Sequence, residues 1–266
     1  MSWTAFLDAA PEAGHAVQIY DDVAELSRSV VHFLDAGFHA GEPALVIAAE
    51  GHWNNFANGL EKRGWDLGRL RQHGLLTCRD ASRMLDGFMD GDGASPERFE
   101  QGVGGAVDEV AARFPDRTIR AFGEMVDLLW RRGRRSAALA VEQLWSALAH
   151  SRRFSLLCAY DLDIFELEVQ TRALPEILRA HTHLRPVADT GRLSAAVDKA
   201  LAEVVGTNRA GQIYLRVAED VPRTELVRAE AVLMWLSKED RSVATEVLDR
   251  ARTHYLGGRA TPTASV

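Results

Sequence analysis

Tyrosines and acids stand directly after apolar segments of this sequence, at positions where the strands of a parallel sheet would end. Tyr20, Asp21 and Asp22 close the segment HAVQIYDD, Tyr160 closes FSLLCAY, and Glu124 follows residues 116–123. After a strand of an ATPase, an acid in the position of Glu124 holds Mg²⁺ or activates water. Without a phosphate loop, two interpretations stay open for Glu124. It is a polar anchor in a ligand pocket, or a helix N-terminal acid stabilised by the helix dipole.

A phosphate-binding loop is absent from the sequence. Such a loop needs glycines, which let backbone N–H groups point inward, and a lysine for the terminal phosphates. Lys62, Lys199 and Lys238 are the three lysines, and none follows a glycine or a strand-to-helix turn. Asp21 and Asp22 occupy the first such turn, where two carboxylates would repel a triphosphate. We therefore expect no ATPase, and no Ser-His-Asp or Cys-His pattern points to another enzyme class.

Histidine and cysteine are too scattered along the sequence to predict a metal centre. Cys78 and Cys158 are far apart and each ends an apolar run, so we expect buried free thiols. The segment HTHLRP holds His181 and His183, but a metal would need a further ligand nearby and the sequence shows none. His15 opens the first strand, away from the carboxyl ends, and a structural role is expected. We predict no bound metal and no cofactor.

Glu142 lies in the middle of an apolar helical segment, where a carboxylate is costly to bury unless it is paired. Arg120 and the arginines of RRGRR (131–135) are the predicted partners of this acid. A structural ion pair is therefore expected here.

Apolar and amphipathic segments alternate over the first 160 residues or so. The expected strands are 15–20, 44–49, 74–80, 116–124 and 154–160, and the expected helices include 24–38, 51–63 and 137–151. This alternation predicts an α/β fold with a mostly parallel sheet that helices cover on both faces. After Tyr160 every segment is expected to be helical, including 189–206 and a stretch from Pro222 to Gly257.

Sheets of this kind bind ligands outside the carboxyl ends of their strands. Tyrosine and tryptophan rings suit such a site, because they combine an apolar face with a polar tip. The predicted ligand-binding residues are those that end or follow the strands, namely Tyr20, Asp21, Asp22, Trp53, Glu124, Cys158 and Tyr160.

Several segments taken together resemble the MEDS family, the methanogen/methylotroph DcmR sensory domain. They are VQIY after His15, GEPALVIA, GEMVDLL, VEQLW at 141–145 and LLCAYD. The resemblance implies a relative of RecA/KaiC-like ATPase domains that has lost the phosphate-binding loop. It also implies a sensory domain for small organic molecules, alone or joined to a regulatory output such as transcription control. We expect this domain over residues 13–185, followed by a C-terminal helical module over residues 186–266.

The predicted function is a cytoplasmic, non-catalytic sensor that binds a small, hydrophobic organic ligand and signals through its helical module. The alternatives are a protein-interaction scaffold with a filled pocket, and an enzyme that uses Glu124 as a base. A net charge of −7 argues against direct nucleic-acid binding, and no apolar run is long enough for a membrane span. The expected partners are a regulatory protein and a second copy of the chain. The predicted dimer face is Leu226, Leu233, Met234 and Leu236.

Overall fold

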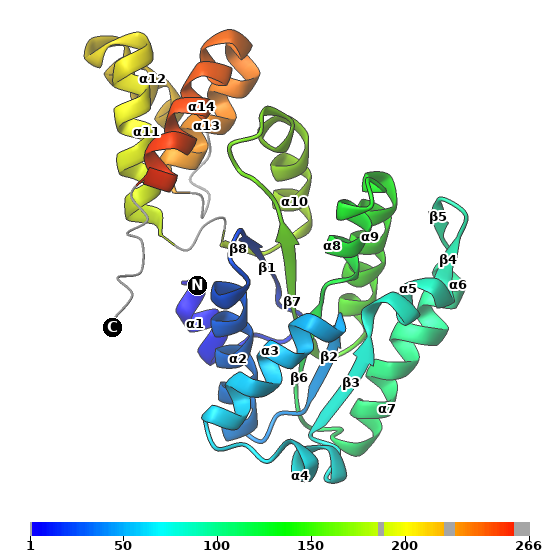
Figure 1. Cartoon of the computed structure of the whole chain (residues 1–266). Coiled ribbons are helices and arrows are strands. Elements are labelled where there is room, and N and C mark those ends of the chain that lie inside the picture. The colour runs from blue at the N-terminus through cyan, green and yellow to red at the C-terminus, as the bar shows by residue number, and fades with distance from the viewer. Residues whose placement is uncertain (1, 186–188, 221–226, 258–266) are drawn as a thin grey trace. The chain divides into compact units, whose positions relative to one another are not determined.

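The structure is a computed structural model that describes residues 2–185, 189–220 and 227–257. The chain divides into two compact units (Figure 1). The sheet unit comprises Met1–Asp161 and Ile177–Arg185, and the helical unit comprises Leu162–Glu176 and Pro186–Val266. The chain therefore leaves the sheet unit after Asp161 and returns to it for nine residues, 177–185, before the last helices.

Six parallel strands form the sheet, in the order β3-β2-β6-β7-β1-β8. They are β1 (His15–Tyr20), β2 (Ala44–Ala48), β3 (Leu76–Asp80), β6 (Ile119–Gly123), β7 (Phe154–Asp161) and β8 (His183–Arg185). The first five lie where the apolar segments predict them. The expectation that only helices follow Tyr160 is wrong, because β8 pairs with residues 16–18 of β1. Three residues are too few to show the alternation by which a strand is recognised.

Helices cover both faces of this α/β sheet, as the sequence predicts (Figure 1). One face carries α1 (Trp3–Asp8), α2 (Val23–His39), α3 (Glu50–Lys62) and α4 (Leu67–Gln72). The other side carries α5 (Ala81–Phe88), α6 (Pro96–Phe99), the π-helix η1 (Glu100–Gly104), α7 (Gly105–Arg113), α8 (Met125–Arg131) and α9 (Arg135–Ser151). A short hairpin of β4 (Met89–Asp90) and β5 (Gly93–Ala94) follows α5.

Side chains alternate between the two faces along each strand. Ala16, Tyr20, Leu157 and Ala159 belong to the core beneath α1–α4. The intervening positions of β1 and β7, which include His15 and Cys158, therefore face the opposite layer, where α9 packs. This alternation decides which polar residues can meet.

The helical unit begins with the π-helix η2 (Val169–Ala173), and α10 (Leu174–Ala180) leads the chain back to the sheet unit. Its main helices are α11 (Thr190–Val205), α12 (Thr207–Asp220), α13 (Arg228–Glu239) and α14 (Arg241–Gly257). Asp189 caps α11 by accepting a hydrogen bond from the Arg192 backbone N–H at 2.8 Å, and Gly206 ends the helix with a φ of +81°. These two ends agree with the helix expected over residues 189–206.

The predicted dimer face is wrong in part. Leu233 and Leu236 are buried inside the helical unit, so they do not belong to an exposed apolar surface. Met234 is half-buried, and Leu226 and Pro222 lie outside the described residues. Dimerisation itself stays a prediction. Among the described residues, no helix is both long and apolar enough to cross a membrane.

Arg120 ties β6 to the layer of α1 and α2. The buried guanidinium donates hydrogen bonds to the carbonyl oxygens of Leu7 at 2.6 Å, Phe33 at 2.9 Å and Asp8 at 3.0 Å. It also pairs with the Glu42 carboxylate at 2.6 Å. These bonds engage four of the five N–H donors of the guanidinium, and charge-assisted bonds of this kind offset the cost of burying its charge.

Close packing over Arg120 requires a glycine in α2. A Cβ atom added at Gly37 would lie 2.5 Å from Cδ of Arg120, whereas one at Gly51 in α3 would meet nothing within 4 Å. We expect Gly37→Ala to lower the free energy of unfolding by about 1–3 kcal/mol, because the added methyl group displaces a buried side chain. Gly51→Ala should leave it unchanged or raise it by up to about 1 kcal/mol. Urea denaturation followed by circular dichroism measures both, and equal values would contradict this packing.

Candidate functional site

Polar side chains of the sheet unit gather in three places. The edge network lies where the strands end and comprises Tyr20, His52, Glu124 and Asp127. The cleft opens beside β2 and β3. The face cluster comprises His15, Glu142, Cys158 and His181, under α9. All three are built by elements of the same unit.

Glu124 connects β6 to the start of α3. Its buried carboxylate accepts hydrogen bonds from the Ala49 backbone N–H and from Nδ1 of His52, the latter at 2.6 Å. The hydrogen bond to Glu124 is the largest influence on His52 and raises the pKa of its imidazole. Glu124 occupies the N-cap position of α8, but its side chain makes no capping hydrogen bond to that helix. Glu124 thus neither caps α8 through its side chain nor lines the cleft, and its carboxylate joins the end of β6 to α3.

Asp127 holds together the ends of β1 and β7. Its carboxylate accepts hydrogen bonds from the Tyr20 hydroxyl at 3.1 Å and from the Asp161 backbone N–H at 2.8 Å. Arg131 lies 2.9 Å away on the next turn of α8. Burial outweighs these contacts and raises the pKa of Asp127 to about 6. Burial likewise raises the pKa of the Tyr20 hydroxyl. Sequence reasoning did not identify Asp127 or His52 as site residues.

The second acid of the first strand-to-helix turn caps a helix. Asp22 is the N-cap of α2 and accepts a hydrogen bond from the Ala24 backbone N–H at 2.8 Å. Asp21 is exposed beside it. An acid therefore supplies negative charge at the start of this helix, which the positive end of the helix dipole favours.

The cleft lies at the carboxyl ends of β2 and β3 and has a volume of about 320 Å³. Its lining combines apolar groups with four charged ones, and comprises Val46, Ala48, Glu50, Trp53, Cys78, Arg79, Asp80 and Arg83. Trp53 is the member of the predicted ligand-binding set that lines it. Burial raises the pKa of Cys78 to about 11, so its thiol, which lines the cleft, is neutral at pH 7. Tyr20 and Glu124 belong to the edge network, Cys158 belongs to the face cluster, and Tyr160 lies beside that cluster.

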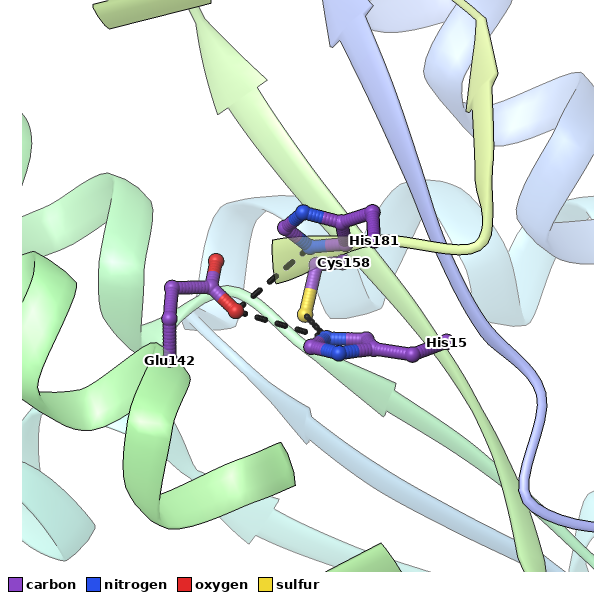
Figure 2. Close-up of side chains that lie close together, drawn as sticks. All are labelled: His15, Glu142, Cys158 and His181. Atoms are coloured by element: carbon purple, nitrogen blue, oxygen red, sulfur yellow. Dashed lines mark hydrogen bonds and ion pairs between the residues drawn. The ribbon is translucent and has the colours of Figure 1, made fainter. Parts of the chain in front are cut away.

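The face cluster brings together residues from four separate segments (Figure 2). His15 comes from β1, Cys158 from β7 and Glu142 from α9, while His181 follows α10. His15 Nε2 lies 3.4 Å from Cys158 Sγ and 3.3 Å from Glu142 Oε2, and His181 Nε2 lies 3.4 Å from the same carboxylate oxygen. The ligand atoms of all four lie within 4.8 Å of one another.

The electrostatics of the cluster set the protonation of its members. Burial lowers the pKa of His181 to about 4, so its imidazole is neutral at pH 7. Burial alone would raise the pKa of Glu142, but His181, His15 and the hydroxyl of Tyr160 outweigh it and lower this pKa to about 2. The Tyr160 hydroxyl donates to Glu142 Oε1 at 2.7 Å. Burial also raises the pKa of the Cys158 thiol well above its usual value.

The predicted partners of Glu142 are wrong. Arg120 lies on the opposite face of the sheet, where it binds Glu42, and within RRGRR Arg131 binds Asp127. Arg134 binds the Gly91 carbonyl oxygen at the β4–β5 turn. Sequence spacing could not identify the true partners, because each lies in a different segment of the chain.

Comparison with known proteins gives one match. A family model described as MEDS, the MEthanogen/methylotroph, DcmR Sensory domain, matches residues 14–182. This span runs from just before β1 to just before β8 and includes all residues of the edge network, the cleft and the face cluster. No curated protein and no solved structure matches the chain.

Because the pKa of Asp127 is raised in the folded chain, the free energy of unfolding should depend on pH. The folded chain holds this proton more tightly than the unfolded chain, so the stability it contributes is present below about pH 4 and is lost as the pH rises through 6. In Asp127→Asn this loss is absent. From pH 4 to 7 the free energy of unfolding of the variant should therefore rise by about 2 kcal/mol relative to wild type.

Urea denaturation at a series of pH values measures this difference. Asp116→Asn, which changes an exposed acid of the same unit, is the control. A parallel course of Asp127→Asn and wild type across this range would show that burial does not perturb Asp127.

Proposed function

Because the chain belongs to the MEDS family of sensory domains, we propose that it is a sensor that binds a small organic molecule in the cleft beside β2 and β3. The cleft is the observation that carries the proposal. Its volume of about 320 Å³ is at the lower end of the range of small-molecule sites, which are about 300–1,000 Å³. It also lies outside the carboxyl ends of parallel strands, where α/β sheets bind ligands.

The lining of the cleft suggests the chemistry of this ligand. Val46, Ala48 and Trp53 offer an apolar wall. Charged side chains of both signs line the same cleft, with Arg79 and Arg83 beside two acids. A compact molecule with an apolar body and one polar group would bury its body against the wall and leave its polar group near the charges.

A binding role without catalysis fits the reactive groups near the cleft. The Cys78 thiol is neutral at pH 7 and is therefore a weak nucleophile. Both oxygens of Glu124 accept hydrogen bonds, from Ala49 and His52, so this acid is engaged in the edge network and not directed to the cleft. An enzyme that uses Glu124 as a base is the less favoured alternative.

We propose that the helical unit transmits the signal of ligand binding. We propose a cytoplasmic regulator in which the bound ligand changes the population of arrangements of α11–α14, and thereby the affinity for a regulatory protein or a second copy. Such coupling requires that the ligand binds one arrangement more tightly than another. Descent from RecA/KaiC-like ATPases with loss of the phosphate loop stays part of this proposal.

Binding is tested with three probes that share an apolar body, namely n-butanol, butyrate and butylamine, by ligand-observed NMR on the full chain. We expect at least one to bind, and Trp53→Ala to weaken this binding by about tenfold or more, because it removes an apolar wall of the site. Trp235→Ala, which changes another half-buried tryptophan in the helical unit, should bind as wild type does.

Native mass spectrometry of the purified chain is the complementary measurement, since a retained molecule would appear as added mass. Absence of both retained mass and probe binding at millimolar concentrations would contradict the sensor and favour an interaction scaffold. Turnover of a probe that Glu124→Gln abolishes would favour the enzyme.

A further inference from the structure

We propose that His15, Glu142, Cys158 and His181 form a four-coordinate binding site for a divalent transition metal ion, with Zn²⁺ as the preferred ion. The proposal is independent of the organic ligand, because the face cluster shares no residue with the cleft. Imidazole nitrogen, thiolate sulfur and carboxylate oxygen are the three ligand types that bind zinc in proteins.

The distances between the ligand atoms fit tetrahedral coordination of one metal ion. With metal–ligand bonds of about 2.0–2.3 Å, neighbouring ligand atoms of a tetrahedral site lie about 3.3–3.6 Å apart. The closest distances in the cluster are 3.3 and 3.4 Å from Glu142 Oε2 to the two imidazoles and 3.4 Å from His15 Nε2 to Cys158 Sγ. The remaining pairs lie within 4.8 Å, so small side-chain adjustments close the tetrahedron.

Hydrogen bonding around His181 leaves a lone pair facing a carboxylate. The carbonyl oxygen of Ile177 can only accept, so Nδ1 of His181, 2.7 Å away, carries the proton. Nε2 of the neutral ring then presents its lone pair to Glu142 Oε2 at 3.4 Å. Two acceptors in this position repel each other unless a cation lies between them.

Three buried polar atoms of the cluster lack a hydrogen-bond partner within the described part of the chain. They are His15 Nδ1, Glu142 Oε2 and His181 Nε2. Native proteins leave few buried polar atoms without a partner, and a bound ion satisfies such atoms where no hydrogen bond does. Two of the three, Glu142 Oε2 and His181 Nε2, are the atoms that would bind the metal.

Charge balance also favours a divalent ion. Binding converts the Cys158 thiol to a thiolate, with its proton released to solvent, so that the ion meets one thiolate, one carboxylate and two neutral imidazoles. The net charge of the occupied site is zero, which suits a location from which water is excluded. Among the described residues, no lysine or arginine pairs with Glu142, so the ion would be the cation that this carboxylate lacks.

Surrounding groups already orient the ligands. The Tyr160 hydroxyl holds Glu142 Oε1 at 2.7 Å and leaves Oε2 for the ion, while Ile177 fixes the ring of His181. Such outer contacts are typical of metal sites. Four protein ligands leave no position for water, so the ion would be structural or regulatory and not catalytic. It would join β1, β7, α9 and the segment after α10.

Metal content of the untagged full chain, grown with zinc and desalted, tests the proposal by inductively coupled plasma mass spectrometry. We expect about one zinc ion per chain. Cys158→Ser and His181→Ala should reduce this content by about tenfold or more, because each removes one of four ligands. Cys78→Ser and His183→Ala are matched controls that should retain it, since neither residue belongs to the cluster. Substoichiometric zinc in wild type, or full zinc in Cys158→Ser, would overturn the proposal.

A second measurement on wild type does not depend on variants that fail to fold. Cobalt added to the metal-free chain should produce a thiolate-to-cobalt charge-transfer absorption, and zinc should protect Cys158 from alkylation while Cys78 serves as the internal reference. Equal alkylation of Cys158 with and without zinc would refute the site.

Discussion

The four central strands β2, β6, β7 and β1 are buried almost throughout, and this burial constrains every charged side chain that they and the covering helices enclose. Glu124, Asp127 and Glu142 are all buried, and a buried carboxylate is costly unless it is paired or protonated. Each acid meets the constraint differently. Glu124 accepts from a backbone N–H and from His52, and Asp127 has a raised pKa. Glu142 stays ionised, accepts a hydrogen bond from the Tyr160 hydroxyl and lies beside two imidazoles.

These differences separate the polar regions of the sheet unit by what each is suited to do. The edge network binds the ends of neighbouring strands to α3 and α8, so it holds the shape of the carboxyl edge. The cleft beside it combines apolar walls with open access and is suited to a small molecule. The face cluster lies within the packed layer under α9 and is suited to an ion. A ligand in the cleft would act at β2 and β3, whereas a metal in the face cluster would act at β1 and β7 of the same sheet.

The sequence predicts what depends on neighbouring residues. Apolar runs locate five strands, and Asp189 and Gly206 mark the ends of α11. The sequence does not predict side-chain contacts that depend on how the strands pair with one another. Val17 pairs with Cys158, which places His15 and Cys158 on one face, and no spacing along the chain reveals that neighbourhood. The sequence held one local signal for the face cluster, because Glu142 is an acid in an apolar helical segment. That signal did not identify the residues that contact Glu142. Trp53 was identified as a site residue because its segment follows a strand, whereas His52 beside it was missed.

The return of residues 177–185 to the sheet unit has a consequence for how the chain is made and divided. Until β8 is added, the backbone of β1 has a partner on one side only, and such an open edge invites pairing with other chains. A ribosome must therefore release the first segment of the helical unit before β8 can pair with β1. For the same reason, a protease or an engineer who cuts the chain after Asp161 would not liberate an intact domain but an aggregation-prone fragment.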